Sequence, residues 1–311
     1  MNNKSVTVLG SYVADLAFRI DRLPTWGETR MGQSFNLGPG GKGSNQAVAA
    51  ARAGANVTFI SKLGQDAFGD IARSLYRAEG IDTQYIFTSP NPTGAAAILI
   101  DAAKGENAII VVPGACFELT LAEVDQATDR IAGSTIFVTQ LELSLSTVEH
   151  GLRLAHTHGV PTILNPAPAT TLPDSIYPLC DYLTPNETEA AALTGIPVTD
   201  LASAEKAATA LLALGVRNVI LTLGAQGALI KNHTLTRHIP AVNSGPVVET
   251  TGAGDAFNGG LAAALAEGMD LVEATKFACA VAGISVTRPG TAPSMPYRAE
   301  IDALRADKAK P

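Results

Sequence analysis

Hydrophobic and polar positions follow two different patterns along the first third of the chain. Residues 6–10 (Val-Thr-Val-Leu-Gly) are mainly apolar, which is typical of a buried strand. Residues 12–22 and 30–37 instead alternate polar and apolar positions, as half-exposed strands do. Residues 44–54, which end in a glycine, and residues 66–79 have the pattern of helices. Further short strands are expected at 57–61, 85–88, 95–100 and 108–112.

From residue 120 onward the pattern becomes a regular alternation of strands and helices. Strands are expected at 134–139, 161–165, 181–184, 217–223 and 227–231, with helices between most of them. Two helical segments, 254–267 and 270–287, follow. Such alternation is typical of a mostly parallel sheet that is covered on both faces. We therefore predict an α/β protein, a three-layer α/β/α sandwich with a mostly parallel central sheet.

The early strands do not fit this alternation. We expect the excursions at about 12–38 and 94–113 to form a small antiparallel β-sheet that projects as a lid. No linker divides the chain, so residues 1–311 are expected to form a single domain. Alternating apolar residues such as Leu16, Phe18 and Ile20 give the lid an apolar face. Because such a face is rarely left uncovered, we expect a homodimer contact there.

The composition limits which classes of partner and which cellular compartment are expected. A net charge of −7 argues against nucleic acid and anionic membranes as partners. No apolar run approaches the ~18–20 residues of a membrane span. The three cysteines (Cys116, Cys180 and Cys279) are far apart and offer no disulfide framework. The first residues lack the features of a signal peptide, so the expected location is cytoplasmic.

The segment 247–258 carries the most specific chemistry. An apolar strand leads into Gly252 and Gly254, and Asp255 then opens a helix of small residues. Unpaired backbone N–H groups and the helix dipole favour an anion at such a helix start, and the glycines let it approach closely. A carboxylate beside an anion hole is what phosphoryl transfer to an alcohol needs. Taken alone, Asp255 is better interpreted as a helix cap, and the rest of the chain reverses this preference.

A second glycine-rich segment, residues 38–46, reads Gly-Pro-Gly-Gly-Lys-Gly-Ser-Asn-Gln. It matches the dinucleotide-binding pattern, but that fold needs the loop directly after the first core strand. It is not a P-loop, because Gly43 follows Lys42 where a P-loop has Ser or Thr. We interpret it as a loop whose backbone approaches a small polar ligand, with Lys42 and Asn45 as hydrogen-bond donors.

Together these segments resemble the two signatures of the ribokinase-like sugar kinases, at residues 40–47 and 251–257. Four further motifs follow in the family's order, at residues 165–168, 184–189, 222–227 and 286–290. The resemblance extends from about residue 6 to residue 305. It implies an ATP-dependent kinase that phosphorylates the 5-hydroxyl of a pentose, with D-ribose as the first choice.

The resemblance also implies roles for individual residues. Asp255 is expected to accept the proton of the sugar hydroxyl, while the backbone of Gly252, Ala253 and Gly254 stabilises the transferring group. Asn186 and Glu189 are expected to organise phosphate and hydrated Mg²⁺. The implied sugar-binding residues are Val13, Asp15, Gly41, Lys42, Gly43, Asn45, Glu142 and Asp255. The implied ATP-binding residues are Asn186, Glu189, Thr222, Leu223, Gly224, Ala225, Gln226, Gly227, Gly254 and Cys279.

Two departures from the family pattern leave alternatives open. The implied monovalent-cation (K⁺) site consists of Glu249, Thr251, Ser285, Arg288, Gly290 and Ser294. Glu249 stands where the family commonly has aspartate, so its longer side chain either intrudes on the ion or is absorbed by the loop. Val13 stands where asparagine is usual, which removes one polar contact to the sugar. A deoxyribokinase, or a kinase of another furanose, hexose or nucleoside, is therefore an alternative, as is a non-catalytic sugar sensor.

Overall fold

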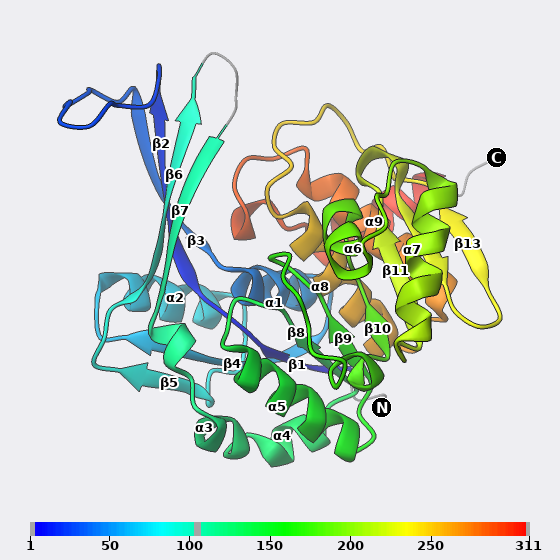
Figure 1. The fold of residues 1–311 in the computed structure, drawn as a ribbon. Helices are drawn as coiled ribbons and strands as arrows, with labels where there is room; N and C mark the ends of the chain where they lie inside the picture. The colour runs from blue at the N-terminus through cyan, green and yellow to red at the C-terminus, as the bar shows by residue number, and fades with distance from the viewer. Residues whose placement is uncertain (1–3, 103–106, 309–311) are drawn as a thin grey trace.

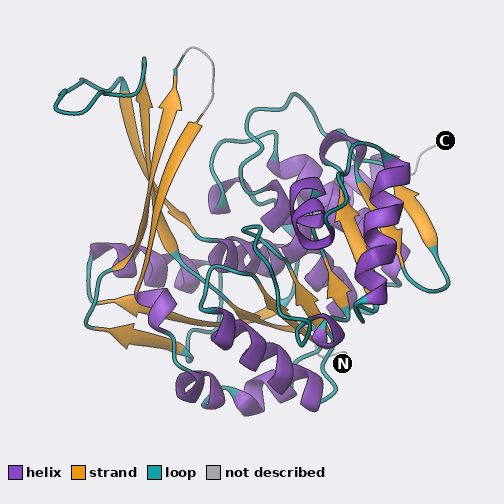
Figure 2. Ribbon diagram, viewed as in Figure 1, coloured by secondary structure: helices purple, strands orange, loops and turns teal. Residues whose placement is uncertain are grey.

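The computed structural model describes residues 4–102 and 107–308. Its main body is a nine-stranded sheet with helices on both faces, and a four-stranded sheet projects from it (Figure 1). Figure 2 shows the same arrangement by element type. The strands of the main sheet, in spatial order, are β13 (Thr236–Ile239), β12 (Ala228–Lys231), β11 (Asn218–Thr222), β10 (Tyr182–Leu183), β9 (Thr162–Leu164), β8 (Ile136–Thr139), β1 (Ser5–Leu9), β4 (Asn56–Gly64) and β5 (Ile86–Ser89).

The main sheet is parallel from β11 to β5, and only β12 and β13 run antiparallel to their neighbours. Consecutive strand residues face opposite sides, so each central strand contributes to two cores. In β11, Ile220 packs in one core and Leu221 in the other, and both are fully buried. This arrangement confirms the predicted three-layer α/β/α fold with a mostly parallel sheet.

Helices from different parts of the chain cover the two faces. The core on one face receives α1 (Lys42–Arg52), α2 (Ala67–Ala78), α8 (Ala253–Ala266), α9 (Leu271–Ser285) and α10 (Arg298–Lys308). The core on the other face receives α3 (Leu121–Asp125), α4 (Thr128–Ala132), α5 (Leu145–Thr157), α6 (Glu187–Thr194) and α7 (Leu201–Ala213). In the described part of the chain, no helix has the length and apolar character needed to cross a membrane.

The projecting small sheet contains, in order, β3 (Ser34–Gly40), β2 (Val13–Ile20), β6 (Thr93–Asp101) and β7 (Asn107–Gly114). The prediction of a purely antiparallel sheet is wrong for its central pair, because β2 and β6 run parallel. Both strands continue outward from parallel strands of the main sheet, β1 and β5, and each pairs antiparallel with its outer neighbour. Residues 103–106, within the predicted excursion 94–113, lie outside the described residues.

Some element boundaries differ from the predicted ones. The alternating patterns at 12–22 and 30–37 extend past the strands, since β2 ends at Ile20 and β3 begins at Ser34. The loop between them is held by the Glu28 carboxylate, which pairs with Arg22 at 2.6 Å and Arg30 at 2.9 Å. Neither β13, where three of four residues are exposed, nor the polar helix α10 was predicted from the hydrophobic pattern.

Candidate active site

Glycines and polar residues around the predicted site follow the carboxyl ends of the parallel strands, where α/β sheets bind ligands. Gly10 and Ser11 follow β1, Gln140 follows β8, and Asn165 follows β9. The first turns of α1 and α8 meet above the same edge (Figure 1). The structure therefore brings the two glycine-rich signatures together, although about 210 residues separate them.

The start of α8 has a tight turn and backbone amides without partners. Gly252 is the N-cap with φ 81°, a left-handed conformation that disfavours any side chain. The N–H of Ala253 donates to Thr250 O at 3.1 Å, and the N–H of Ala256 donates to Gly252 O at 2.8 Å. Within the described residues, the N–H groups of Gly254 and Asp255 have no acceptor. Gly254 itself is exposed, and a Cβ there would meet no atom within 4 Å.

Asp255 is buried, with 6% of its surface exposed, and both of its oxygens accept hydrogen bonds from α1. Asn45 Nδ2 donates to Oδ2 at 3.0 Å, and Gln46 Nε2 donates to Oδ1 at 3.0 Å. This contact depends on the close approach of α1 and α8. A Cβ on Gly259 would lie 2.4 Å from the Cβ of Ala49, so only glycine fits there.

Glu142 and Lys42 occupy the start of α1. Glu142 Oε2 accepts from the N–H of Lys42 at 2.9 Å and from the Ser11 hydroxyl at 2.5 Å, so it caps the helix. The Lys42 ammonium makes no ion pair within 4 Å to any residue that the structure describes. Burial lowers the pKa of Lys42, but the carboxylates of Asp255, Glu142 and Glu189 outweigh burial and raise it. The cation is therefore held among carboxylates and remains available to a ligand.

Asp15 and Val13 lie two residues apart on β2, so their side chains share one face of the small sheet. The Thr291 hydroxyl lies 3.3 Å from Asp15 Oδ2 and 3.0 Å from Pro39 O. The pKa of the Asp15 carboxyl is raised to about 6, mainly by burial. The Thr291 hydrogen bond opposes this rise, and the charges of Glu142, Asp255 and Glu249 add to it.

Glycines leave room for Asp15 and for the turn into α1. A Cβ on Gly40 would lie 2.2 Å from Asp15 Oδ2, so a side chain there would displace the carboxylate. Gly41 has φ 86° and lies against the backbone of Tyr12 and Val13. A Cβ on Gly43 would meet the backbone of Gly10 at 2.6 Å. The glycines of this loop therefore serve close backbone packing around the predicted sugar residues.

Asn186 and Glu189 form a reciprocal capping box at the start of α6. Asn186 Oδ1 accepts from the N–H of Glu189 at 2.8 Å, and Glu189 Oε2 accepts from the N–H of Asn186 at 2.9 Å. Burial raises the pKa of the Glu189 carboxyl, and the nearby Lys42 charge opposes the rise. The pair thus has a structural role in α6 and also lies within the electrostatic reach of Lys42 and Asp255.

The turn at residues 222–227 joins β11 to β12. The N–H of Leu223 donates to Gly227 O at 2.8 Å, and the N–H of Thr222 donates to Pro185 O, just before α6, at 2.9 Å. Gly227 has φ 98°, and a Cβ there would meet Ile239 O at 2.1 Å, so this glycine lets the turn pack against the backbone at the end of β13. Gly224 is more open, since a Cβ there would meet only the Glu187 carboxylate at 4.0 Å.

Ala225, Gln226 and Cys279 complete the predicted nucleotide residues. Ala225 and Gln226 are exposed in the one-turn 3₁₀ helix Gly224–Gln226, and the Gln226 carbonyl lies 2.7 Å from His238 Nε2. Cys279 lies within α9, 5% exposed, and burial raises the pKa of its thiol to about 12. The cysteine packs in the core on the α9 face of the sheet.

The predicted cation residues lie around one loop. Glu249 Oε2 accepts from the N–H of Gly290 at 2.9 Å, so its longer side chain reaches across the loop. The hydroxyls of Ser285 and Ser294 donate to backbone carbonyls, and Arg288 pairs with Glu300. Thr251 is exposed just before the start of α8. Among the described residues, no cluster of three or more His, Cys, Asp or Glu side chains is arranged to hold a metal.

The sequence did not reveal several polar residues that complete this region. Thr291 and Ser11 contact predicted sugar residues, and Gln46 contacts Asp255. Gln46 belongs to the glycine-rich signature, and Asn165 opens another of the family motifs. For Gln46 and Asn165, membership of a motif was the only indication that the sequence offered, and it did not specify the hydrogen-bond partner.

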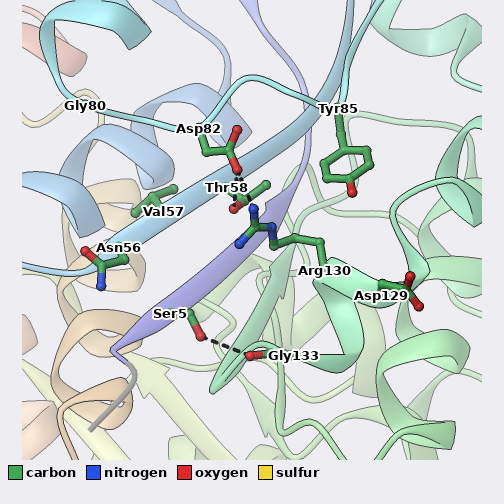
Figure 3. Close-up of a pocket in the computed structure, with 10 residues that line it drawn as sticks. All are labelled: Ser5, Asn56, Val57, Thr58, Gly80, Asp82, Tyr85, Asp129, Arg130 and Gly133. Atoms are coloured by element: carbon green, nitrogen blue, oxygen red, sulfur yellow. Dashed lines mark hydrogen bonds and ion pairs between the residues drawn. The ribbon is translucent and has the colours of Figure 1, made fainter. Parts of the chain in front are cut away.

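A separate pocket of about 490 Å³ opens on the opposite edge of the main sheet (Figure 3). Ser5 and Asn56, the first residues of β1 and β4, help to line it, and Arg130 pairs there with Asp82 at 2.9 Å. It contains none of the predicted site residues. The candidate active site is therefore defined by converging residues at the carboxyl edge and not by this cavity.

Comparison with known proteins identifies the class of enzyme to which this fold belongs. A family model described as pfkB family carbohydrate kinase matches residues 3–298, and the chain belongs to this family. Ribokinase of Haemophilus influenzae is 44% identical over 298 residues, which cover 96% of this chain and 97% of that protein. A deoxyribokinase of Salmonella typhi is 37% identical over 294 residues, which cover 94% and 95%. A solved structure of Arabidopsis thaliana ribokinase complexed with ribose and ATP has a TM-score of 0.93 at 31% identity, covering 98% of this chain and 99% of that one.

Proposed function

We propose that this carbohydrate kinase transfers the γ-phosphoryl group of ATP to the 5-hydroxyl of D-ribose. The observation that carries the proposal is the buried Asp255 carboxylate, which lies in the first turn of α8 beside two backbone amides without acceptors. The relatives named ribokinase and the structure with ribose and ATP support the same substrates.

The chemistry follows from this geometry. The sugar 5-oxygen forms a bond to the γ-phosphorus while the bond from that phosphorus to the bridging oxygen of ADP breaks. The hydroxyl proton passes to Asp255, whose oxygens keep lone pairs beyond the two donors that they already accept. The amides of Gly254 and Asp255 and the Lys42 ammonium stabilise negative charge on the transferring group.

The sugar residues are proposed to surround the hydroxyls opposite Asp255. Asp15, Asn45 and Glu142 offer carboxylate and amide groups around the start of α1, and charged acceptors bind sugar hydroxyls strongly. Asn45 already donates to Asp255, so the sugar would lie beside the adjoining first turns of α1 and α8.

Asn186 and Glu189 fit a role in organising hydrated Mg²⁺. Both Glu189 oxygens accept from Asn186, at 2.9 and 3.0 Å, so the pair suits hydrogen bonding to metal-bound water better than direct ligation. Mg²⁺ held there would neutralise negative charge on the phosphates of ATP. Residues 222–227 and Gly254 are proposed to border the nucleotide.

Activation by K⁺ is proposed at the loop of Glu249, Thr251, Ser285, Arg288, Gly290 and Ser294. The Glu249 carboxylate already bonds to the Gly290 amide, so the loop accommodates the longer side chain. This position keeps a negative charge beside the start of α8. An ion held there would supply positive charge close to the anion hole.

Deoxyribose phosphorylation is the second candidate. Val13 is buried, with 4% exposed, on the same face of β2 as Asp15, so an apolar group faces the proposed sugar position. The identity to a deoxyribokinase of Salmonella typhi supports this alternative.

We also propose that the small sheet is a lid over the sugar and a contact for a second copy of the chain. Its edge strand β7 exposes four consecutive apolar residues (Ile109, Ile110, Val111 and Val112), each about half exposed or more. Such an edge favours pairing with another strand. The three free, buried cysteines support the proposal of a reducing cytoplasmic location.

Release of ADP from ATP and Mg²⁺ with a panel of alcohols tests the function directly. Turnover is expected to be highest with D-ribose and measurable with 2-deoxyribose. Sugar binding without turnover on any member of the panel would instead establish a sensor. A preference for a nucleoside or a hexose would overturn the pentose assignment and keep the kinase class.

A further inference from the structure

Three buried amide side chains form a connected set around Asp255. Gln46 Nε2 donates one proton to Asp255 Oδ1 at 3.0 Å and the other to Asn165 Oδ1 at 3.1 Å. Gln140 Nε2 donates to Gln46 Oε1 at 2.8 Å. Gln46 is completely buried, and Gln140 and Asn165 are at most 6% exposed. Gln46 therefore has no surface with which to touch a ligand.

The polarity of this set is determined by Asp255. An ionised carboxylate only accepts, so Gln46 must present its nitrogen to it. The Gln46 oxygen then faces Gln140, which must in turn present its own nitrogen. Rotating the Gln46 amide by half a turn would oppose oxygen to oxygen at both Asp255 and Asn165, and nitrogen to nitrogen at Gln140. The orientation of Gln46 is thus fixed by three partners at once.

The same set is anchored to the main sheet and returns to α8. Gln140 and Asn165 follow β8 and β9, which are adjacent parallel strands. Asn165 Nδ2 donates to Thr184 O at 3.2 Å, and the Thr184 hydroxyl donates to Asn258 Oδ1 at 2.6 Å. Asn258 Nδ2 donates to Gly254 O at 2.8 Å, in the first turn of α8. A closed circuit of hydrogen bonds therefore links the carboxylate to the turn that carries the anion hole.

We propose that Gln46 is a positioning residue that fixes the Asp255 carboxylate relative to the start of α8. With both oxygens held, the carboxylate cannot rotate about its terminal torsion, which is otherwise broad. The proton acceptor is then in place before the sugar binds, and no reorientation is needed during transfer. This inference rests on the proposed role of Asp255 as the base.

The test combines Gln46→Met with Asp255→Asn. Methionine keeps the length of the side chain and removes both donors and the acceptor. We expect Gln46→Met to lower kcat roughly ten- to hundredfold, as for a lost hydrogen bond to a buried charged group. The KM for ATP should change far less. In the Asp255→Asn background the same substitution should cause no further loss of the residual kcat, because Gln46 acts through Asp255.

A purely structural role for Gln46 would lower kcat by the same factor in both backgrounds, and that result would overturn the proposal. A parent-like kcat in Gln46→Met would also overturn it. Gln126→Met, at the exposed end of α3, is the matched control and should leave kcat unchanged. If Gln46→Met does not fold, Gln140→Met decides, with a smaller loss expected that again disappears in the Asp255→Asn background.

The two hypotheses fail differently. Full turnover in Asp255→Asn would refute the base and hence the proposed function of that residue. Loss of turnover in Asp255→Asn together with normal turnover in a folded Gln46→Met would refute only the positioning role. Melting temperatures of all variants separate these outcomes from loss of folded protein.

Discussion

Replacing Asp15 with asparagine should stabilise the fold at neutral pH while it weakens sugar binding. The pKa of Asp15 rises from 3.8 to about 6, chiefly through burial, so folding favours the protonated carboxyl. The protonated carboxyl therefore contributes to the free energy of unfolding. This contribution is complete below about pH 4 and is lost as pH rises through about 6. Roughly two pKa units correspond to about 3 kcal/mol at neutral pH as an upper limit. Asparagine does not ionise, and Thr291 can still donate to its oxygen.

Denaturant unfolding at pH 4 and pH 8 measures this effect. Parent and Asp15→Asn should have similar free energies of unfolding at pH 4, and the variant should be more stable at pH 8. In parallel, the sugar KM of the parent should rise about tenfold from pH 7 to pH 5, as a group with a pKa near 6 loses its charge. The KM of the variant should be high at both pH values. A variant less stable than the parent at pH 8, or a parent KM that does not change with pH, would refute the reasoning.

Asp255→Asn should lower turnover by several orders of magnitude with nucleotide binding largely retained, as measured by ADP release and by nucleotide titration. Val13→Asn should improve kcat/KM for ribose over 2-deoxyribose roughly ten- to hundredfold, for a gained buried polar contact; an unchanged ratio means that position 13 does not contact the sugar. Gly40→Ala should raise the sugar KM by displacing the Asp15 carboxylate, whereas Gly38→Ala, where a Cβ would meet only Asn36 at 3.9 Å, should leave it unchanged. Val111→Lys should convert a dimer into a monomer by mass measurement, and a strict monomer in the parent would count against the lid contact.

The main fold was predictable because its strands are buried on both faces and its helices have regular apolar spacing. The pairing of β2 with β6 was not predictable, since the two strands lie about 80 residues apart and either direction satisfies the same alternation. The limits of β2 and β3 were missed because ion pairs around Glu28, and not a change in hydrophobic pattern, hold the loop between them.

The site was predictable where motifs specify backbone geometry. Gly252 and Asp255 could be assigned to a helix start because glycines directly before a run of small residues mark a tight turn into a helix. The partners of Asp255 could not be assigned in the same way. An amide such as Gln46 inside a helix resembles any polar helical residue in sequence, and only the close packing of α1 on α8 shows that it is buried.

The small sheet is continuous with the residues proposed to hold the sugar. β2 carries Val13 and Asp15, and β3 runs through Gly40 directly into α1. A contact that fixes the tilt of this sheet therefore also fixes the distance between Asp15 and the start of α1. If two copies pair through this sheet, as proposed, any factor by which pairing changes sugar affinity equals the factor by which the sugar changes pairing affinity. Sugar binding would then depend on the protein concentration.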